Sequence, residues 1–141
     1  MKIAIGCDHG GYLLKQDILI WLEEHDYEFE DFGCYNTESV DYPVYAEKVA
    51  RAVASKGIVI CTTGIGVSMA ANKVKGIRCA LCGDSYSAEM TRRHNDANVL
   101  AMGAGIIGPN LAKKITEVFL TTEFEGGRHA RRVGLLDNIQ P

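Results

Sequence analysis

Residues 61–68 (CTTGIGVS) place a thiol, two hydroxyls and a glycine turn at one strand-to-helix corner. The apolar run 58–60 precedes this corner, and the helix-favouring residues 69–73 follow it. Such a corner presents backbone N–H groups and a helix N-terminus, both of which favour anions, beside a side chain able to move a proton. The pattern predicts proton chemistry on a phosphorylated small molecule.

The thiol of Cys61 is the candidate base at this corner, because a nearby helix N-terminus favours the thiolate. The alternative is a buried cysteine that only ends a strand. The backbone N–H groups between Thr62 and Gly66 would form an anion hole, in which loss of one donor typically costs about 100-fold to 1000-fold in rate. An ordinary glycine turn with Ser68 as helix N-cap is compatible with that role.

Composition predicts one compact domain over residues 1–141, since the chain has 141 residues and is 47% hydrophobic. The formal net charge of −3 and the pI near 5.8 argue against nucleic acid as a partner, which normally needs a basic face. Arg128, Arg131 and Arg132 form a local positive cluster that suits a small anion better.

The sequence predicts a cytoplasmic protein without a membrane-spanning segment. Residues 1–6 have too short an apolar run for a signal peptide, and no segment approaches the roughly 20 apolar residues of a membrane span. The five cysteines form an odd set, so a zinc site or a disulfide framework is not expected.

Strand-like and helix-like segments alternate along the chain. Strands are expected over 2–6, 27–32, 58–61, 77–82 and 98–102, with helical patterns between them and two helices after residue 108. This order predicts an α/β fold: a single Rossmann-like α/β/α sandwich with a five-stranded parallel sheet and a C-terminal helical extension. Ligands of such sheets bind at the carboxyl ends of the strands.

Polar residues occur where the expected strands and helices end. Residues 7–9 (CDH) follow the first strand, residues 61–64 (CTTG) follow the third, and residues 103–105 (GAG) follow the fifth. Residues 94–96 (HND) end the fourth helix.

Nearly the whole chain resembles the ribose-5-phosphate isomerase B and galactose-6-phosphate isomerase group of sugar-phosphate isomerases. Several separate motifs in order carry the resemblance: GCDH at 6–9, DFG at 31–33, ESVDYP at 38–43, CTTGIGVS at 61–68, AANK at 70–73, HNDAN at 94–98 and EGGRH at 125–129 with Arg132. Cys61 and the intact GGRH segment are more similar to ribose-5-phosphate isomerase B than to the paired galactose-6-phosphate subunits.

The resemblance implies isomerisation of ribose 5-phosphate and ribulose 5-phosphate through a cis-enediolate. It implies Cys61 as base, Thr63 as a further catalytic residue and His94 as the acid that opens the sugar ring. It also implies a homodimer, often paired into a dimer of dimers, whose active sites combine residues of two subunits. No metal or organic cofactor is implied.

Ligands of the sugar phosphate are implied in the same way. They are Asp8, His9, Tyr42, Thr62, Gly64, Ile65, Gly66, Asn95, Arg128 and Arg132. The two arginines are four residues apart, so on a helix they share a face and could fork a phosphate. Taken alone, Asp8 could equally be a turn or N-cap residue, Tyr42 a packing residue and His94 a partner of the helix dipole. His129 is left unassigned.

Three positions depart from the family pattern. Thr62 stands where glycine is usual, and a β-branched residue would be strained if that position needs a positive φ. Gly105 stands where an arginine is common, which bears on substrate length or affinity. The link 54–57 is shorter than usual, at the end of the sheet opposite the expected site, where length changes are tolerated.

Other functions remain open from the sequence. Allose 6-phosphate or another six-carbon aldose phosphate is the closest rival substrate, and a catalytically impaired homologue that still binds sugar phosphate is a further alternative. A phospho-receiver would need an acidic residue after the third strand and a lysine after the fifth, where Cys61 and Gly103 stand. A dinucleotide site is not supported, because residues 6–11 lack the GxGxxG spacing.

Overall fold

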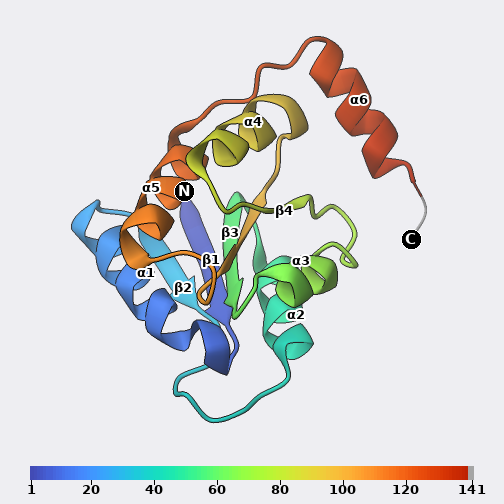
Figure 1. Cartoon of the computed structure of the whole chain (residues 1–141). Helices are drawn as coiled ribbons and strands as arrows, with labels where there is room; N and C mark the ends of the chain where they lie inside the picture. The colour runs from blue at the N-terminus through green and yellow to red at the C-terminus, as the bar shows by residue number, and fades with distance from the viewer. Residues whose placement is uncertain (140–141) are drawn as a thin grey trace.

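The computed structural model describes residues 1–139, which fold around a parallel five-stranded sheet (Figure 1). The strands are β1 (Lys2–Cys7), β2 (Glu28–Asp31), β3 (Lys56–Cys61), β4 (Cys79–Leu81) and β5 (Val99–Gly103). They lie in the order β2-β1-β3-β5-β4. The central strands β1, β3 and β5 are almost wholly buried, as expected of a parallel sheet covered on both faces. Each fully buried branched side chain, such as Ile58 or Ile60, contributes roughly 1.5–3 kcal/mol.

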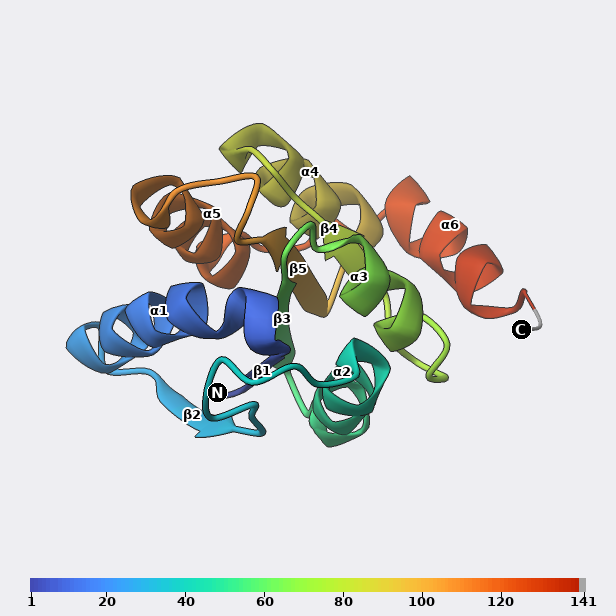
Figure 2. The same cartoon turned by 60° about the horizontal axis from the view of Figure 1, so that its bottom comes forward.

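Helices cover both faces of this sheet (Figure 2). One layer contains α1 (Tyr12–Glu24), α4 (Ser85–Asn95) and α5 (Pro109–Thr121), and the other contains α2 (Tyr42–Ala52) and α3 (Ile65–Ala71). A short 3-10 turn, η1 (His9–Gly11), links β1 to α1. The last helix, α6 (Arg128–Asp137), packs against α4 beyond the body of the sandwich (Figure 1). The predicted α/β sandwich with a C-terminal helical extension is confirmed.

Capping residues define where two of these helices begin. Asp84 is the N-cap of α4: its Oδ1 accepts a hydrogen bond of 2.7 Å from the Ser87 N–H and its Oδ2 one of 3.0 Å from the Ser87 hydroxyl, and these two bonds lower the pKa of Asp84. The predicted cap of α3 by Ser68 is wrong. Gly64 is the N-cap, and the Ser68 hydroxyl instead donates to the Ile65 carbonyl at 2.7 Å, inside the helix.

Lys15 is a buried cation beneath the end of β2. Its side chain is fully inaccessible, and Nζ donates to Asp31 Oδ1 at 2.7 Å and to the Cys34 carbonyl at 2.6 Å. Asp31 Oδ1 also accepts from the Gly33 N–H at 2.9 Å. One ammonium group therefore fixes the chain where it leaves the sheet after β2.

The cysteines are all free thiols. Burial raises the pKa of Cys7 and of Cys79 to about 12 and that of Cys82 to about 11. The thiols of these three residues therefore remain protonated at neutral pH. Within residues 1–139, none of the helices combines the length and the apolar character needed to cross a membrane.

Candidate active site

The backbone of the turn after β3 folds back toward the Cys61 thiol and donates a hydrogen bond to it. Cys61 ends the strand with 6% of its surface exposed, and its Sγ accepts a hydrogen bond of 3.1 Å from the Gly64 N–H. The Ile65 N–H is bound by Thr63 Oγ1 at 3.2 Å. Gly64 has a φ of +78°, and a Cβ at this position would lie 2.5 Å from Leu81 Cδ1, so the turn requires glycine here. A backbone N–H donor at the start of α3 thus faces the sulfur.

Thr62 does not carry the backbone strain that its β-branched side chain suggested. Among the described residues, positive φ outside glycine occurs only at Asp26 and Asp96. The strain considered for Thr62 is therefore absent, because the positive φ of the turn falls on Gly64. Thr62 is exposed, and its carbonyl accepts from the Gly105 N–H at 2.7 Å.

Asp8 and His9 lie beside this turn, directly after β1. Asp8 is 6% exposed, its N–H donates to the Ile60 carbonyl at 3.2 Å, and its Oδ1 accepts from the Gly11 N–H at 3.2 Å. Asp8 is thus the N-cap of η1, the alternative left open by the sequence. His9 Nδ1 accepts from the Val40 N–H at 3.1 Å, which leaves its proton on Nε2 as a donor.

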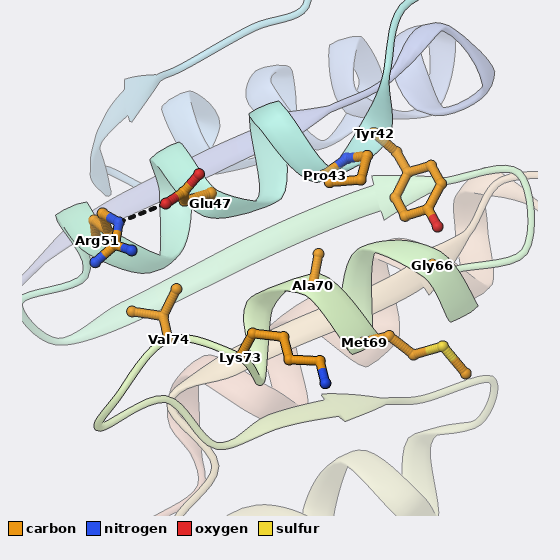
Figure 3. Close-up of a pocket in the computed structure, with 9 residues that line it drawn as sticks. All are labelled: Tyr42, Pro43, Glu47, Arg51, Gly66, Met69, Ala70, Lys73 and Val74. Atoms are coloured by element: carbon orange, nitrogen blue, oxygen red, sulfur yellow. Dashed lines mark hydrogen bonds and ion pairs between the residues drawn. The ribbon is translucent and has the colours of Figure 1, made fainter. Parts of the chain in front are cut away.

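Tyr42 and Gly66 bring α2 next to the same turn. They line one end of a cavity of about 420 Å³ between α2 and α3, with Met69 and Lys73 further along it (Figure 3). The Tyr42 hydroxyl points toward α3 beside Gly66 (Figure 3). The carboxyl edge of the sheet therefore gathers one group of predicted site residues: Asp8, His9, Tyr42, Cys61, Thr62, Thr63, Gly64, Ile65 and Gly66.

A second group of predicted residues lies between α4 and α6. His94 and Asn95 form the last turn of α4 and share a cavity of about 260 Å³ with Arg132 of α6. Arg128 begins α6, four residues before Arg132, and both arginines are exposed.

The two groups lie at opposite ends of the sheet. Gly57, near the start of β3, pairs with Val99 and donates to the Asn98 carbonyl at 2.8 Å, whereas Cys61 pairs with Gly103. The His94 group leads into β5 at its amino end, so four residues of strand, roughly 13 Å, separate it from the level of Cys61. In Figure 1 the strands run away from α6 toward the turn that joins β3 to α3. A single chain does not bring Cys61 and His94 together.

Glu125 and His129 are polar residues of the second group that the sequence did not assign. The His94 and His129 rings stack with centroids 4.2 Å apart and an interplanar angle of 9°. Glu125 Oε1 lies 3.5 Å from His129 Nε2 and 4.0 Å from His94 Nε2. Burial, followed by the charges of His94, Arg128 and Arg132, lowers the pKa of His129. The four-residue spacing of Glu125 and His129, just before and inside α6, was the available signal.

This trio is also the group of metal-type ligands that residues 1–139 bring closest together, with ligand atoms within 4.8 Å of one another. The stacked rings do not suit a metal ion, because an ion in the plane of one imidazole lies well out of the plane of the other.

A parallel α/β sandwich with a thiol and backbone N–H groups at the carboxyl edge of its sheet is typical of enzymes that act on small molecules. The Ribose/Galactose Isomerase family model matches residues 3–136. Ribose-5-phosphate isomerase B of Escherichia coli is 48% identical over 143 residues, covering 99% of this chain and 96% of the relative.

Solved structures give the same relationship. That of Clostridium thermocellum ribose-5-phosphate isomerase B has a TM-score of 0.95 at 55% identity, covering 97% of this chain and 95% of the other. The Thermotoga maritima ribose 5-phosphate isomerase structure has a TM-score of 0.95 at 45% identity and covers 98% of both chains. The chain belongs to the ribose/galactose isomerase family.

Proposed function

We propose that this protein interconverts ribose 5-phosphate and ribulose 5-phosphate. The observation that carries the proposal is the Cys61 thiol at the end of β3, with the Gly64 N–H directed at its sulfur. Relatives and solved structures named ribose-5-phosphate isomerase B support the choice of substrate.

Cys61 is the base in the proposed reaction. Its thiolate takes the proton from C2 of the open aldose, and the electrons form the cis-enediolate. The same proton returns from the thiol to C1 while the O2 hydroxyl proton passes to O1, so atoms and electrons balance without an oxidant. Backbone N–H groups of residues 62–66 bind the negative oxygen of the enediolate, with Thr63 and Ile65 shaping that turn. Asp8 and Tyr42 bind sugar hydroxyls, and the Nε2–H of His9 faces a hydroxyl or the phosphate.

His94 delivers the proton that opens the sugar ring, and Asn95 binds a hydroxyl beside it. Arg128 and Arg132 are four residues apart on α6 and bind the phosphate through paired N–H donors. These residues lie at the other end of the sheet from Cys61, so the proposal includes a second copy of the chain. In a homodimer, the α4–α6 end of one copy completes the Cys61 turn of its partner, and dimers pair further into a dimer of dimers. One domain over residues 1–141 forms each copy.

The test is turnover of ribose 5-phosphate and allose 6-phosphate by the wild-type protein and by Cys61→Ala, with Cys79→Ala as control. We expect turnover of ribose 5-phosphate that falls by roughly 100-fold or more in Cys61→Ala and is retained in Cys79→Ala. Activity that survives in Cys61→Ala would remove this thiol as the base. Preference for allose 6-phosphate would assign a six-carbon substrate instead.

A further inference from the structure

The contact between α4 and α6 contains an arrangement of acid and base groups that the proposed reaction has not used. His94 closes α4, His129 lies in the first turn of α6, and Glu125 precedes α6. The two imidazole rings stack nearly parallel to each other, and Glu125 Oε1 lies close to the Nε2 atom of both rings.

We propose that Glu125 and His129 are positioning residues for His94: the buried His129 ring holds the His94 ring by stacking, and the Glu125 carboxylate, 4.0 Å from His94 Nε2, stabilises the charged form of His94. This inference rests on the proposed function, in which His94 is the ring-opening acid.

Burial separates the roles of the two rings. His129 is 6% exposed, and its Nε2 has no hydrogen-bond partner, whereas the His94 side chain is 40% exposed and lines the open cavity. A proton on both stacked rings would place like charges face to face, so the pair holds one proton. The buried ring pays the larger desolvation cost if charged, and Arg128 and Arg132 repel a charge there. The proton therefore belongs on His94, which faces the cavity that a substrate can enter.

Hydrogen bonds to Arg93 hold Glu125 so that its carboxylate oxygen Oε1 faces the two imidazole rings. Its N–H donates to the Arg93 carbonyl at 3.1 Å, and its Oε2 accepts from Arg93 Nη1 at 3.4 Å. Arg93 in turn bonds Glu89 at 2.8 Å, so its charge is shared between two carboxylates. Oε1 faces both imidazoles, His129 Nε2 at 3.5 Å and His94 Nε2 at 4.0 Å, so the carboxylate favours one proton on the pair. Burial and the two arginines, rather than Glu125, keep that proton off His129. The charged groups facing the pair are thus Arg93 and Glu89 of α4, Glu125 of the link, and Arg128 and Arg132 of α6.

The first experiment is an NMR titration of the imidazole C–H signals, which the presence of only four histidines makes assignable. We expect His129 to stay neutral while His94 titrates. In Glu125→Gln, the His94 midpoint moves to lower pH by about half a unit or more. The control Glu117→Gln removes an exposed carboxylate that pairs with Lys114 on α5, and it leaves the midpoint unchanged. An unchanged midpoint in Glu125→Gln, or a charged His129, would overturn the proposal.

Kinetics separate positioning from a structural role. In Glu125→Gln, the alkaline limb of the kcat profile shifts to lower pH with the midpoint, and KM stays within about twofold, since a purely structural loss lowers kcat equally at every pH. His129→Phe keeps a stacking ring and retains most of kcat, whereas His129→Ala loses about tenfold. Equal effects of these two variants would overturn the stacking role. Full activity in His94→Gln would instead remove the acid role from the proposed function, while the titration would still decide where the proton lies.

Discussion

Thr62 and Gly105 are in direct contact at the carboxyl edge of the sheet. The Gly105 N–H donates to the Thr62 carbonyl at 2.7 Å, and a Cβ at Gly105 would lie 3.0 Å from both that oxygen and Thr62 Cγ2. The two departures from the family pattern are therefore one contact. The threonine methyl fills the space that a side chain at residue 105 would need.

This contact predicts that Gly105→Ala lowers the free energy of unfolding by about 1 kcal/mol through overpacking. Thr62→Ser removes the methyl group, so Thr62→Ser/Gly105→Ala should recover part of the loss. Urea denaturation of the four proteins gives the coupling energy as a double-mutant cycle. Additive effects of the two substitutions on the free energy of unfolding would show that the two residues are not energetically coupled.

The separation of Cys61 from His94 leads to a complementation prediction. Cys61→Ala and His94→Gln homodimers should each have greatly reduced activity, but a mixed dimer carries one site with both wild-type residues. Random re-pairing after reversible unfolding should then restore about a quarter of wild-type activity. The control mixes Cys61→Ala with the double variant Cys61→Ala/His94→Gln, and it should restore none. No recovery in the first mixture would refute a site shared between copies.

The buried Lys15–Asp31 pair predicts a large cost for removing the cation. Lys15→Met leaves the Asp31 carboxylate and the Cys34 carbonyl without their donor, and we expect a loss of about 3–5 kcal/mol in the free energy of unfolding. Lys2→Met is the matched control, because its pair with Glu30 is 3.5 Å long and exposed, and it should cost no more than about 1 kcal/mol. Similar losses in the two variants would contradict the structural role of Lys15.

His129 predicts a pH dependence of stability. Its pKa is lowered in the folded protein, so below the unfolded value of about 6.5 the unfolded chain binds a proton that the folded chain does not. The free energy of unfolding should therefore decrease as pH falls below about 6.5, and this site should contribute nothing above it. His129→Phe should flatten that slope, measured by urea denaturation from pH 7.5 to pH 5. An identical slope in the variant would exclude this linkage.

Periodicity and residue type predicted the fold well because its determinants are local. Runs such as 58–60 are apolar on both faces, which only a covered parallel sheet accommodates. Asp84 carries the cap of α4 in its own side chain. The expected cap at Ser68 failed because the turn starts the helix four residues earlier, where Gly64 supplies the backbone conformation without a side-chain cap.

The candidate site was less accessible from sequence because its geometry is not local. Residue type and motif identify Cys61 and His94 as candidates, but they do not show that the two residues lie at opposite ends of the sheet. That separation depends on the strand order, in which β5 lies between β3 and β4. The His94–His129 stack joins helices that are far apart along the chain. Lys15 occupies a position on the buried face of α1, where helical spacing alone predicts an apolar residue.

The position of α6, packed on α4 beyond the sandwich, has a consequence for how activity responds to the amount of protein. The proposed site assembled from two copies would exist only in the associated fraction, so we expect specific activity to fall on dilution below the dissociation constant of the dimer. A substitution in the α4–α6 contact can then lower activity at low protein concentration while leaving each fully assembled site intact. Concentrating the protein would restore that activity, which sets such variants apart from those that damage the chemistry.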